Sequence, residues 1–316
     1  MVNSRLEKNK KQRKDIAKEE HIETTKNISK KIFKLFFIFI LFFGSIYILC
    51  RYLGTSGLIV REYSLKYDNL PDNFYGLKII QISDINYNKD TINIKKIKKL
   101  VKKINSIRPD IIVFTGNLIY GETTQEEKNN LETELTKLDA SLGKYAVFGD
   151  DNDDSKIIIK NAGFEDIENT YDLIYKNGYT PILITGIANN DINLDNTFSY
   201  FESENANNDI FTISLMHKPD TITSVLNYHS VDLAMAGHSL NGLIRIPKLG
   251  GIFVNTGCKK YYEPYYKIDN TDFYISSGIG TRKYPYRLFN HPSINFYRLK
   301  WHIRICVIFI YNSYNK

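Results

Sequence analysis

The sequence predicts an α/β protein in which two packed β-sheets, flanked by helices, follow an N-terminal transmembrane helix. Three features of the 316-residue chain predict this arrangement. Strand-like and helix-like segments alternate between residues 77 and 148, short strand-like segments dominate after residue 162, and residues 35–50 contain no charge. Such alternation is typical of a parallel sheet with right-handed crossovers, and the strand-rich second half supplies a second sheet.

The uncharged segment, residues 35–50, predicts a membrane anchor. With the apolar residues on both sides it approaches the roughly 20 residues that cross a bilayer, so we place the span at residues 32–53. A cleaved signal peptide is the alternative. It fits less well, because the basic segment before the span is over thirty residues long and no cleavage site follows Cys50. We therefore expect a single-pass protein of the cell membrane, in contact with membrane lipid through its anchor.

Positive charge is concentrated before this span. Residues 1–34 contain eleven Lys and Arg against five Asp and Glu, a balance of +6, which leaves +1 of the total +7 for the rest. This asymmetry predicts a cytoplasmic N-terminus and an extracytoplasmic main domain. The near-neutral remainder argues against a nucleic-acid partner. We expect residues 1–31 to form a basic cytoplasmic tail, either disordered or loosely helical near anionic headgroups.

Residue patterns place the elements of the main domain, residues 55–300. Strands are predicted at 58–67, 77–82, 110–117, 145–148, 182–187, 210–216, 231–236, 243–246, 251–254, 273–276 and 294–299. Helical spacing of apolar residues predicts a helix at 92–107, another from a capping box near Thr124 to Gly143, and a third at 219–228. The last residues, 301–316, are expected to form an added edge strand or a loosely packed tail.

Polar side chains follow the ends of five predicted strands. They are Asp84 and Asn86, Asn117, Asp150 and Asp151, His217, and His238. Each one alone has an ordinary explanation, because Asp and Asn favour turns and a lone His is usually a hydrogen-bonded structural residue. Together, however, these residue types are the ligands of divalent metals. Since α/β sheets bind ligands at the carboxyl ends of strands, their recurrence predicts a metal site there.

The motifs around these residues resemble those of a known family. They read Ser-Asp-Ile-Asn at 83–86, Gly-Asn at 116–117, Gly-Asp-Asp-Asn at 149–152, Met-His-Lys-Pro-Asp at 216–220 and Gly-His-Ser-Leu-Asn-Gly at 237–242. In order and spacing they are similar to the motifs of the calcineurin-like metallophosphoesterases, in particular the membrane-anchored bacterial branch. The resemblance implies a two-sheet β-sandwich flanked by helices, and hydrolysis of phosphate esters between two metal ions.

The resemblance also implies which residues would hold the first metal, and most of them are substituted. This metal would take Asp84, Asn86, Asn117 and Leu240, of which only Asp84 is a carboxylate. A neutral amide cannot bridge two dications as a carboxylate does, and Leu has no ligand atom. We therefore expect the first site not to hold a metal tightly.

The second metal, by the same resemblance, would take Asn117, Asp150, His217 and His238. Two imidazoles and a carboxylate can bind manganese, zinc or iron. Asp151 stands at the position of the family's catalytic His, so no catalytic residue is assigned. An anion at that position should oppose the binding of an anionic substrate.

Two functions remain open from the sequence, and with them the question whether the chain is an enzyme. The first is a degenerate phosphoesterase domain with impaired or lost two-metal catalysis, kept as a membrane-tethered binding module. The second is an active phosphoesterase with a single metal at Asp150, His217 and His238. The cofactor is accordingly one divalent metal or none. A phosphate ester or an envelope lipid is the expected ligand, by analogy with the family.

Overall fold

The structure is a computed structural model that describes residues 2–88, 92–204, 206–252, 256–282 and 284–301. The chain divides into two compact units, Met1–Arg51 and Tyr52–Lys316, which are described separately. Helix α1, Val2–Ile48, makes up the first unit, and a π-helical turn, Leu49–Leu53, follows it.

One long helical segment, Lys10–Leu53, stands out among the described residues because it is long and apolar enough to cross a membrane. The span predicted at residues 32–53 lies inside it. The basic segment before that span, for which the sequence left disorder and loose helix open, is part of the same helix. The apolar side chains of this helix, such as Phe33 and Phe42, are exposed in the chain by itself, as expected of a surface that faces lipid.

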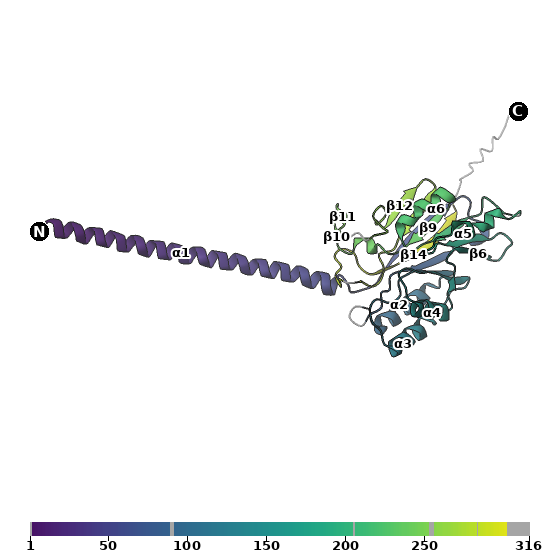
Figure 1. The fold of residues 1–316 in the computed structure, drawn as a ribbon, viewed down its shortest axis with the longest axis horizontal. Helices are drawn as coiled ribbons and strands as arrows, with labels where there is room; N and C mark the ends of the chain where they lie inside the picture. The colour runs from purple at the N-terminus through teal and green to yellow at the C-terminus, as the bar shows by residue number, and fades with distance from the viewer. Residues whose placement is uncertain (1, 89–91, 205, 253–255, 283, 302–316) are drawn as a thin grey trace, which may run out of the picture. The chain divides into compact units, whose positions relative to one another are not determined.

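Two six-stranded sheets form the centre of the described part of the second unit (Figure 1). The first sheet has the strand order β1 (Ile59–Tyr67), β14 (Ser293–Trp301), β2 (Lys78–Ile82), β3 (Ile111–Thr115), β4 (Gly143–Val147) and β5 (Glu165–Asp166). The order in the second sheet is β12 (Tyr265–Ile268), β13 (Thr271–Ile275), β9 (Leu233–Ala236), β8 (Thr212–Leu215), β7 (Ile182–Gly186) and β6 (Thr170–Ile174). A separate hairpin pairs β10 (Arg245–Ile246) with β11 (Gly250–Gly251). The predicted fold class is therefore confirmed.

Helices cover the outer faces of both sheets. The first sheet is covered by α2 (Ile94–Ile107), α3 (Gln125–Leu135) and α4 (Asp153–Asn161), which Figure 1 shows grouped on one side. The second sheet has α5 (Leu194–Thr197) and α6 (Ile222–Tyr228) on its outer face. Short 3₁₀ turns lie at Asp72–Phe74, Ser199–Glu202, Pro219–Thr221 and Leu240–Gly242.

The layers pack because the strands are apolar on both faces. Ile79 and Val113 from the first sheet meet Ile184 and Leu215 from the second in a buried cluster between the sheets. The neighbouring residue of β2, Ile80, points the opposite way and packs against the α2–α4 layer. Strands buried on both faces read as continuous apolar runs, which is why the sequence identified them so readily.

Parallel pairing gathers the strand ends that carry the polar residues. β2, β3 and β4 are parallel neighbours, with Ile80 opposite Ile112. β7, β8, β9 and β13 are parallel neighbours in the second sheet. The two sets of carboxyl ends meet, since the backbone N–H of His238 after β9 donates to Asp84 after β2 over 2.8 Å. The site therefore forms where both sheets end.

Several local predictions were wrong or incomplete. The helix predicted from Thr124 to Gly143 begins with the expected capping box but ends at Leu135. Leu138 and Leu142, which follow it, pack into the core from a loop and a strand flank outside the helix. Helix α4 was missed because its Asp-rich start was interpreted only as a turn, whereas Asn152 caps it. β5, β6, β12 and α5 were also missed, being short or half-exposed. Part of the strand predicted at 251–254, and the tail after residue 301, lie outside the described residues.

Candidate metal centre

Three side chains that could hold a metal come together at this end of the sheets. One ligand atom each from Asp150, His217 and His238 lies within 4.8 Å of the other two. Asp150 follows β4, His217 follows β8 and His238 follows β9, so each comes from a different strand end. Both histidines are buried, whereas Asp150 lies at the surface.

The two imidazole rings are fixed by backbone carbonyls. Nδ1 of His217 lies 2.7 Å from the carbonyl oxygen of Thr115, and Nε2 of His238 lies 2.7 Å from that of Thr256. A carbonyl only accepts, so these nitrogens carry the ring protons and the other two nitrogens are bare. The bare nitrogens, His217 Nε2 and His238 Nδ1, are 3.1 Å apart. Because two facing lone pairs repel, this arrangement favours a cation beside them.

Neither histidine binds a second proton at neutral pH, so protonation does not relieve the repulsion between the two bare nitrogens. Burial lowers the pKa of His217 to about 4, against a smaller opposing effect of Asp84. Burial likewise lowers the pKa of His238. Both rings are therefore neutral near pH 7 and present lone pairs, the form in which histidine binds metals.

Arg282 brings a positive charge to this point. Its Nη2 lies 3.3 Å from Nδ1 of His238 and 3.5 Å from Nε2 of His217. The same guanidinium forms ion pairs with Asp84 at 3.8 Å and with Asp150 at 3.6 Å. Arg282 was not predicted. Arg282 lies seven residues after the end of β13. Polar residues were sought after five predicted strands, and extending that search to β13 would have found it.

Asp84 is held by the backbone and by its neighbours. Its side chain is fully buried, and Oδ2 accepts hydrogen bonds from the Ser83 hydroxyl at 2.6 Å and from the His238 N–H. Oδ1 has no hydrogen-bond partner among the described residues, so the guanidinium of Arg282 is its compensating charge. Asp84 and Asn86 both have φ near +45°, a conformation that non-glycine residues rarely adopt and that often marks functional sites.

Asn117 contacts two of the candidate ligands, His217 and Asp150. Its amide nitrogen lies 3.2 Å from Nε2 of His217, and its amide oxygen accepts the N–H of Asp150 over 2.6 Å. Asn189, which was not predicted, donates to the carboxylate of Asp150 over 3.2 Å. Partial burial acts to raise the pKa of Asp150, but Arg282 and His217 outweigh it, and the pKa is lowered. Asp150 is therefore ionised and available as a ligand.

Asp151 is engaged by the backbone. Its two carboxylate oxygens accept the N–H of Leu118 at 2.6 Å and that of Gly149 at 3.1 Å, which joins the loops after β3 and β4. Burial raises the pKa of Asp151 to about 6. The structure thus gives this residue a bridging role between loops, and its neighbour Asn152 serves as the cap of α4.

Two glycines allow the strand ends to approach this closely. A Cβ at Gly237 would lie 2.0 Å from the hydroxyl oxygen of Ser83, and one at Gly149 would lie 2.5 Å from Nε2 of His217. Both distances are far inside contact range. Only glycine lets the backbone pass next to the site at these positions.

A cavity of about 290 Å³ opens beside the cluster. It is lined by Asn86, Asn117, Ile119, Tyr120, Gly121, Asp150, Asn152 and Arg282. Guanidinium and amide groups together are suited to hydrogen-bond the oxygens of a phosphate group. The carboxylate of Asp150 on the same wall opposes an anion, although Arg282 pairs with it.

A family model described as calcineurin-like phosphoesterase matches residues 77–242. The chain belongs to the calcineurin-like phosphoesterase family. The match includes all of the predicted ligands, from Asp84 to His238, and it confirms the resemblance seen in the sequence. Arg282 lies outside the matched residues.

Several proteins of this family are similar to the chain. An uncharacterized metallophosphoesterase of Bacillus subtilis, YkuE, is 29% identical over 269 residues, which cover 81% of this chain and 91% of that protein. A zebrafish (Danio rerio) transmembrane protein with a metallophosphoesterase domain is 21% identical over 74% of this chain and 56% of its own length. The UDP-2,3-diacylglucosamine pyrophosphatase LpxG of Chlamydia muridarum is 40% identical over 83 residues, a quarter of each chain.

The family is metal-dependent, and the residues of this member fit one metal ion better than two. A second ion would need negatively charged bridging and terminal ligands. Apart from Asp84, however, the residues at the positions that the family resemblance assigns to this ion are the neutral amides of Asn86 and Asn117 and the alkyl side chain of Leu240. One ion fits the donor set of Asp150, His217 and His238, where an ionised carboxylate meets two bare imidazole nitrogens. The guanidinium of Arg282 would have to move away to admit it.

Proposed function

We propose that this chain is a membrane-associated phosphoesterase-family protein that binds a phosphate ester through Arg282 and has lost two-metal catalysis. The observation that supports the proposal is the position of Arg282. Its guanidinium faces both bare imidazole nitrogens and both carboxylates of the cluster, and it lines the adjacent cavity. This built-in cation supplies one positive charge where the family's metals supply several, and it balances one of the two carboxylates that it faces.

The remaining residues of the site would position the phosphate group. The amides of Asn86 and Asn117 line the same cavity as Arg282 and can donate to phosphate oxygens. Asp84 and Asp150 hold the guanidinium in place through their ion pairs. Both carboxylate oxygens of Asp151, at the family's catalytic position, accept backbone N–H groups, which supports a structural role for this residue over proton donation to a leaving group.

A single-metal hydrolase is the second candidate, and the facing imidazole lone pairs favour it. Asp150, His217 and His238 would hold the ion, which would polarise the phosphate and a bound water. Asn117 would keep Asp150 in position by accepting its backbone N–H, and its amide nitrogen would have to leave Nε2 of His217, because the ion would take that lone pair. In this alternative Arg282 would turn into the cavity and bind the substrate.

The setting of the site points to a lipid-related phosphate ester. The chain begins with a helix apolar enough to cross a membrane, and its Chlamydia relative is named as a pyrophosphatase of a diacylated sugar nucleotide. The Lys and Arg excess before the span favours an N-terminus in the cytoplasm and the second unit outside it. The proposal is therefore a single-pass cell-membrane protein with a lipid-linked or envelope phosphate as its ligand class.

Three measurements on the full chain in detergent micelles separate the two candidates. They are metal content after purification, hydrolysis of bis(p-nitrophenyl) phosphate in added manganese, and binding of p-nitrophenyl phosphate by calorimetry. Phosphate binding that Arg282→Gln abolishes and Arg298→Gln preserves, without bound metal or turnover, is the expected result. Arg298, on β14, is the matched control because it forms its ion pair with Glu62 of β1 and with no residue of the cluster among those described. Stoichiometric metal with turnover that His217→Gln abolishes would establish the hydrolase and overturn the first proposal.

A further inference from the structure

The β10–β11 hairpin exposes apolar side chains next to a second cavity. Ile246 and Leu249 on the hairpin and Phe289 on the neighbouring loop are 39%, 76% and 67% exposed. All three line the same cavity, of about 510 Å³. Scattered exposed apolar residues need no explanation, but three around one hollow form a patch that water solvates poorly. We call Ile246, Leu249 and Phe289 the hairpin patch.

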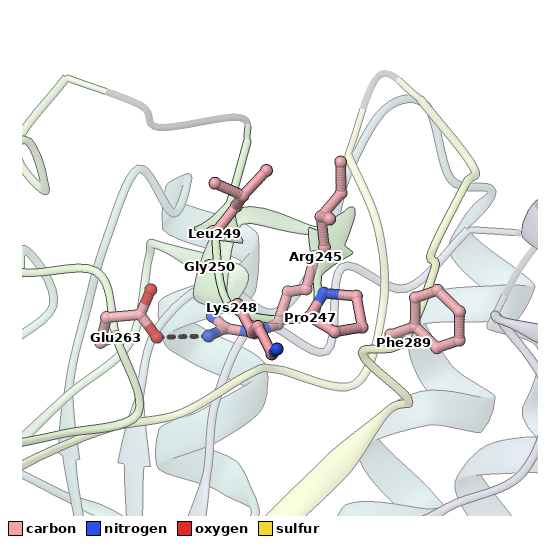
Figure 2. A pocket seen from close by; sticks show the side chains of 8 residues that line it. Arg245, Pro247, Lys248, Leu249, Gly250, Glu263 and Phe289 are labelled. Atoms are coloured by element: carbon pink, nitrogen blue, oxygen red, sulfur yellow. Dashed lines mark hydrogen bonds and ion pairs between the residues drawn. The ribbon is translucent and has the colours of Figure 1, made fainter.

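Basic groups accompany the hairpin patch. Lys248, at the turn between the two strands, is exposed and lines the cavity. Arg245 lines it too and forms an ion pair with Glu263, as Figure 2 shows. The three charged residues of the cavity thus leave one net positive charge, that of Lys248. In the same view Leu249 points away from the Arg245–Glu263 pair.

The hairpin patch lies at the end of the fold where the first strand begins. β10 is joined to the loop of Phe289 by a hydrogen bond of 2.9 Å from the N–H of Arg245 to Leu288. That loop continues into Pro292, whose carbonyl accepts the N–H of Ile59, the first residue of β1, over 2.9 Å. The patch and the start of β1 are therefore attached to the same short segment.

This end of the fold is also tethered closely to the candidate membrane helix. Leu53 ends the apolar helical segment and Ile59 begins β1, so residues 54–58 are all that separates them. Such a linker spans at most about 20 Å even when fully extended. The inference rests on the membrane-spanning role proposed for this helix: once the helix crosses a bilayer, any surface near Ile59 stays within reach of that bilayer.

The hairpin patch is connected to the candidate metal centre as well. The 3₁₀ turn Leu240–Gly242 leads from His238 directly to the hairpin. Asn290, next to Phe289, donates its side-chain N–H to the carbonyl of Leu240 over 2.6 Å. The hairpin and the loop of Phe289 are thus held by the same turn that carries the site, at the same end of the fold.

We propose that the hairpin patch rests in the headgroup region of an anionic bilayer. Its apolar side chains would enter the boundary of the acyl chains, and Lys248 would face lipid phosphates. Apolar groups combined with a cation are the composition of surfaces that lie in the membrane interface, and the short tether makes the contact intramolecular in effect. This inference concerns a surface away from the Arg282 site, so it stands whether or not that site binds or hydrolyses a phosphate ester.

The test uses tryptophan fluorescence of the full chain in lipid vesicles. Leu249→Trp places a reporter on the hairpin patch, and Tyr179→Trp places one before β7, at the end of the second sheet opposite its carboxyl ends. Tyr179 is fully exposed and Leu249 is 76% exposed, so both substitutions should be tolerated. In vesicles of phosphatidylcholine with phosphatidylglycerol, replacing part of the phosphatidylcholine by a brominated form should quench Leu249→Trp at least twice as strongly as Tyr179→Trp. The fluorescence of the native Trp301 is measured in the unsubstituted chain and subtracted from that of each variant.

The charge of the surface is tested in the same assay. Adding Lys248→Glu to Leu249→Trp should reduce the quenching in vesicles that contain phosphatidylglycerol and change it little in pure phosphatidylcholine. Equal quenching of the two reporters would overturn the proposal. So would a blue shift of Leu249→Trp that follows protein concentration instead of lipid, because a second copy of the chain would then cover the patch.

Discussion

Replacing Arg282 by Gln should strengthen the binding of a divalent metal. Glutamine keeps a polar side chain of similar length but removes the positive charge that faces His217, His238, Asp84 and Asp150. In the native chain a metal ion has to displace the guanidinium from the same donor atoms. In Arg282→Gln those atoms are free to bind the ion.

The size of the effect follows from the contacts. The guanidinium is partly exposed and its four contacts are 3.3–3.8 Å long, so solvent screening keeps each one small. Together they stabilise the metal-free arrangement by about 1.5–3 kcal/mol, the range for hydrogen bonds to charged groups. Because each 1.4 kcal/mol is about a factor of ten, the metal dissociation constant should fall by about ten- to a hundredfold.

Calorimetric titration of manganese or zinc into the full chain in detergent measures this constant. Arg282→Lys, which keeps the charge but loses the planar fork, should lie between the native chain and Arg282→Gln. Arg298→Gln removes an equal charge from β14 and should change nothing. Unchanged or weaker metal binding in Arg282→Gln would refute the reasoning, because the guanidinium would then not compete for the ligands.

Two further predictions concern stability. The pKa of Asp151 is raised by burial from 3.8 to about 6, so the folded chain holds this proton more tightly than the unfolded chain. Its contribution to stability should fall by about 3 kcal/mol as pH rises from about 4 to about 6. Asp151→Asn should flatten that part of the stability curve in denaturant unfolding, and an unaltered curve would contradict the assignment. Arg287 is fully buried and donates to the carbonyls of Ser277, Gly280 and two other residues, so Arg287→Leu should cost about 3–5 kcal/mol of unfolding free energy. A loss below about 1 kcal/mol would mean that the loop finds other partners.

Local patterns predicted those elements whose stability depends on their own residues. The apolar runs of β2 and β3 are recognisable because both faces are buried, and the Thr124–Glu127 capping box is a local hydrogen-bonding unit. β6 and β12 were not predicted, because apolar and polar residues alternate only weakly in these edge strands and their pairing depends on neighbouring strands. Helix α4 escaped because the same Asp and Asn residues serve both turns and helix caps.

The sequence by itself determined the family, the two-sheet architecture, the apolar N-terminal segment and the residue types that follow each strand. These depend on composition and order along the chain, which a single sequence contains. Only the tertiary structure decided which of those residues meet. It turned the carboxylate of Asp151 to two backbone N–H groups, aimed the bare nitrogens of His217 and His238 at each other, and brought Arg282 from a distant loop among them. The physical reason is that lone-pair direction and charge pairing depend on the positions of side chains from different strand ends, which a local sequence pattern does not contain.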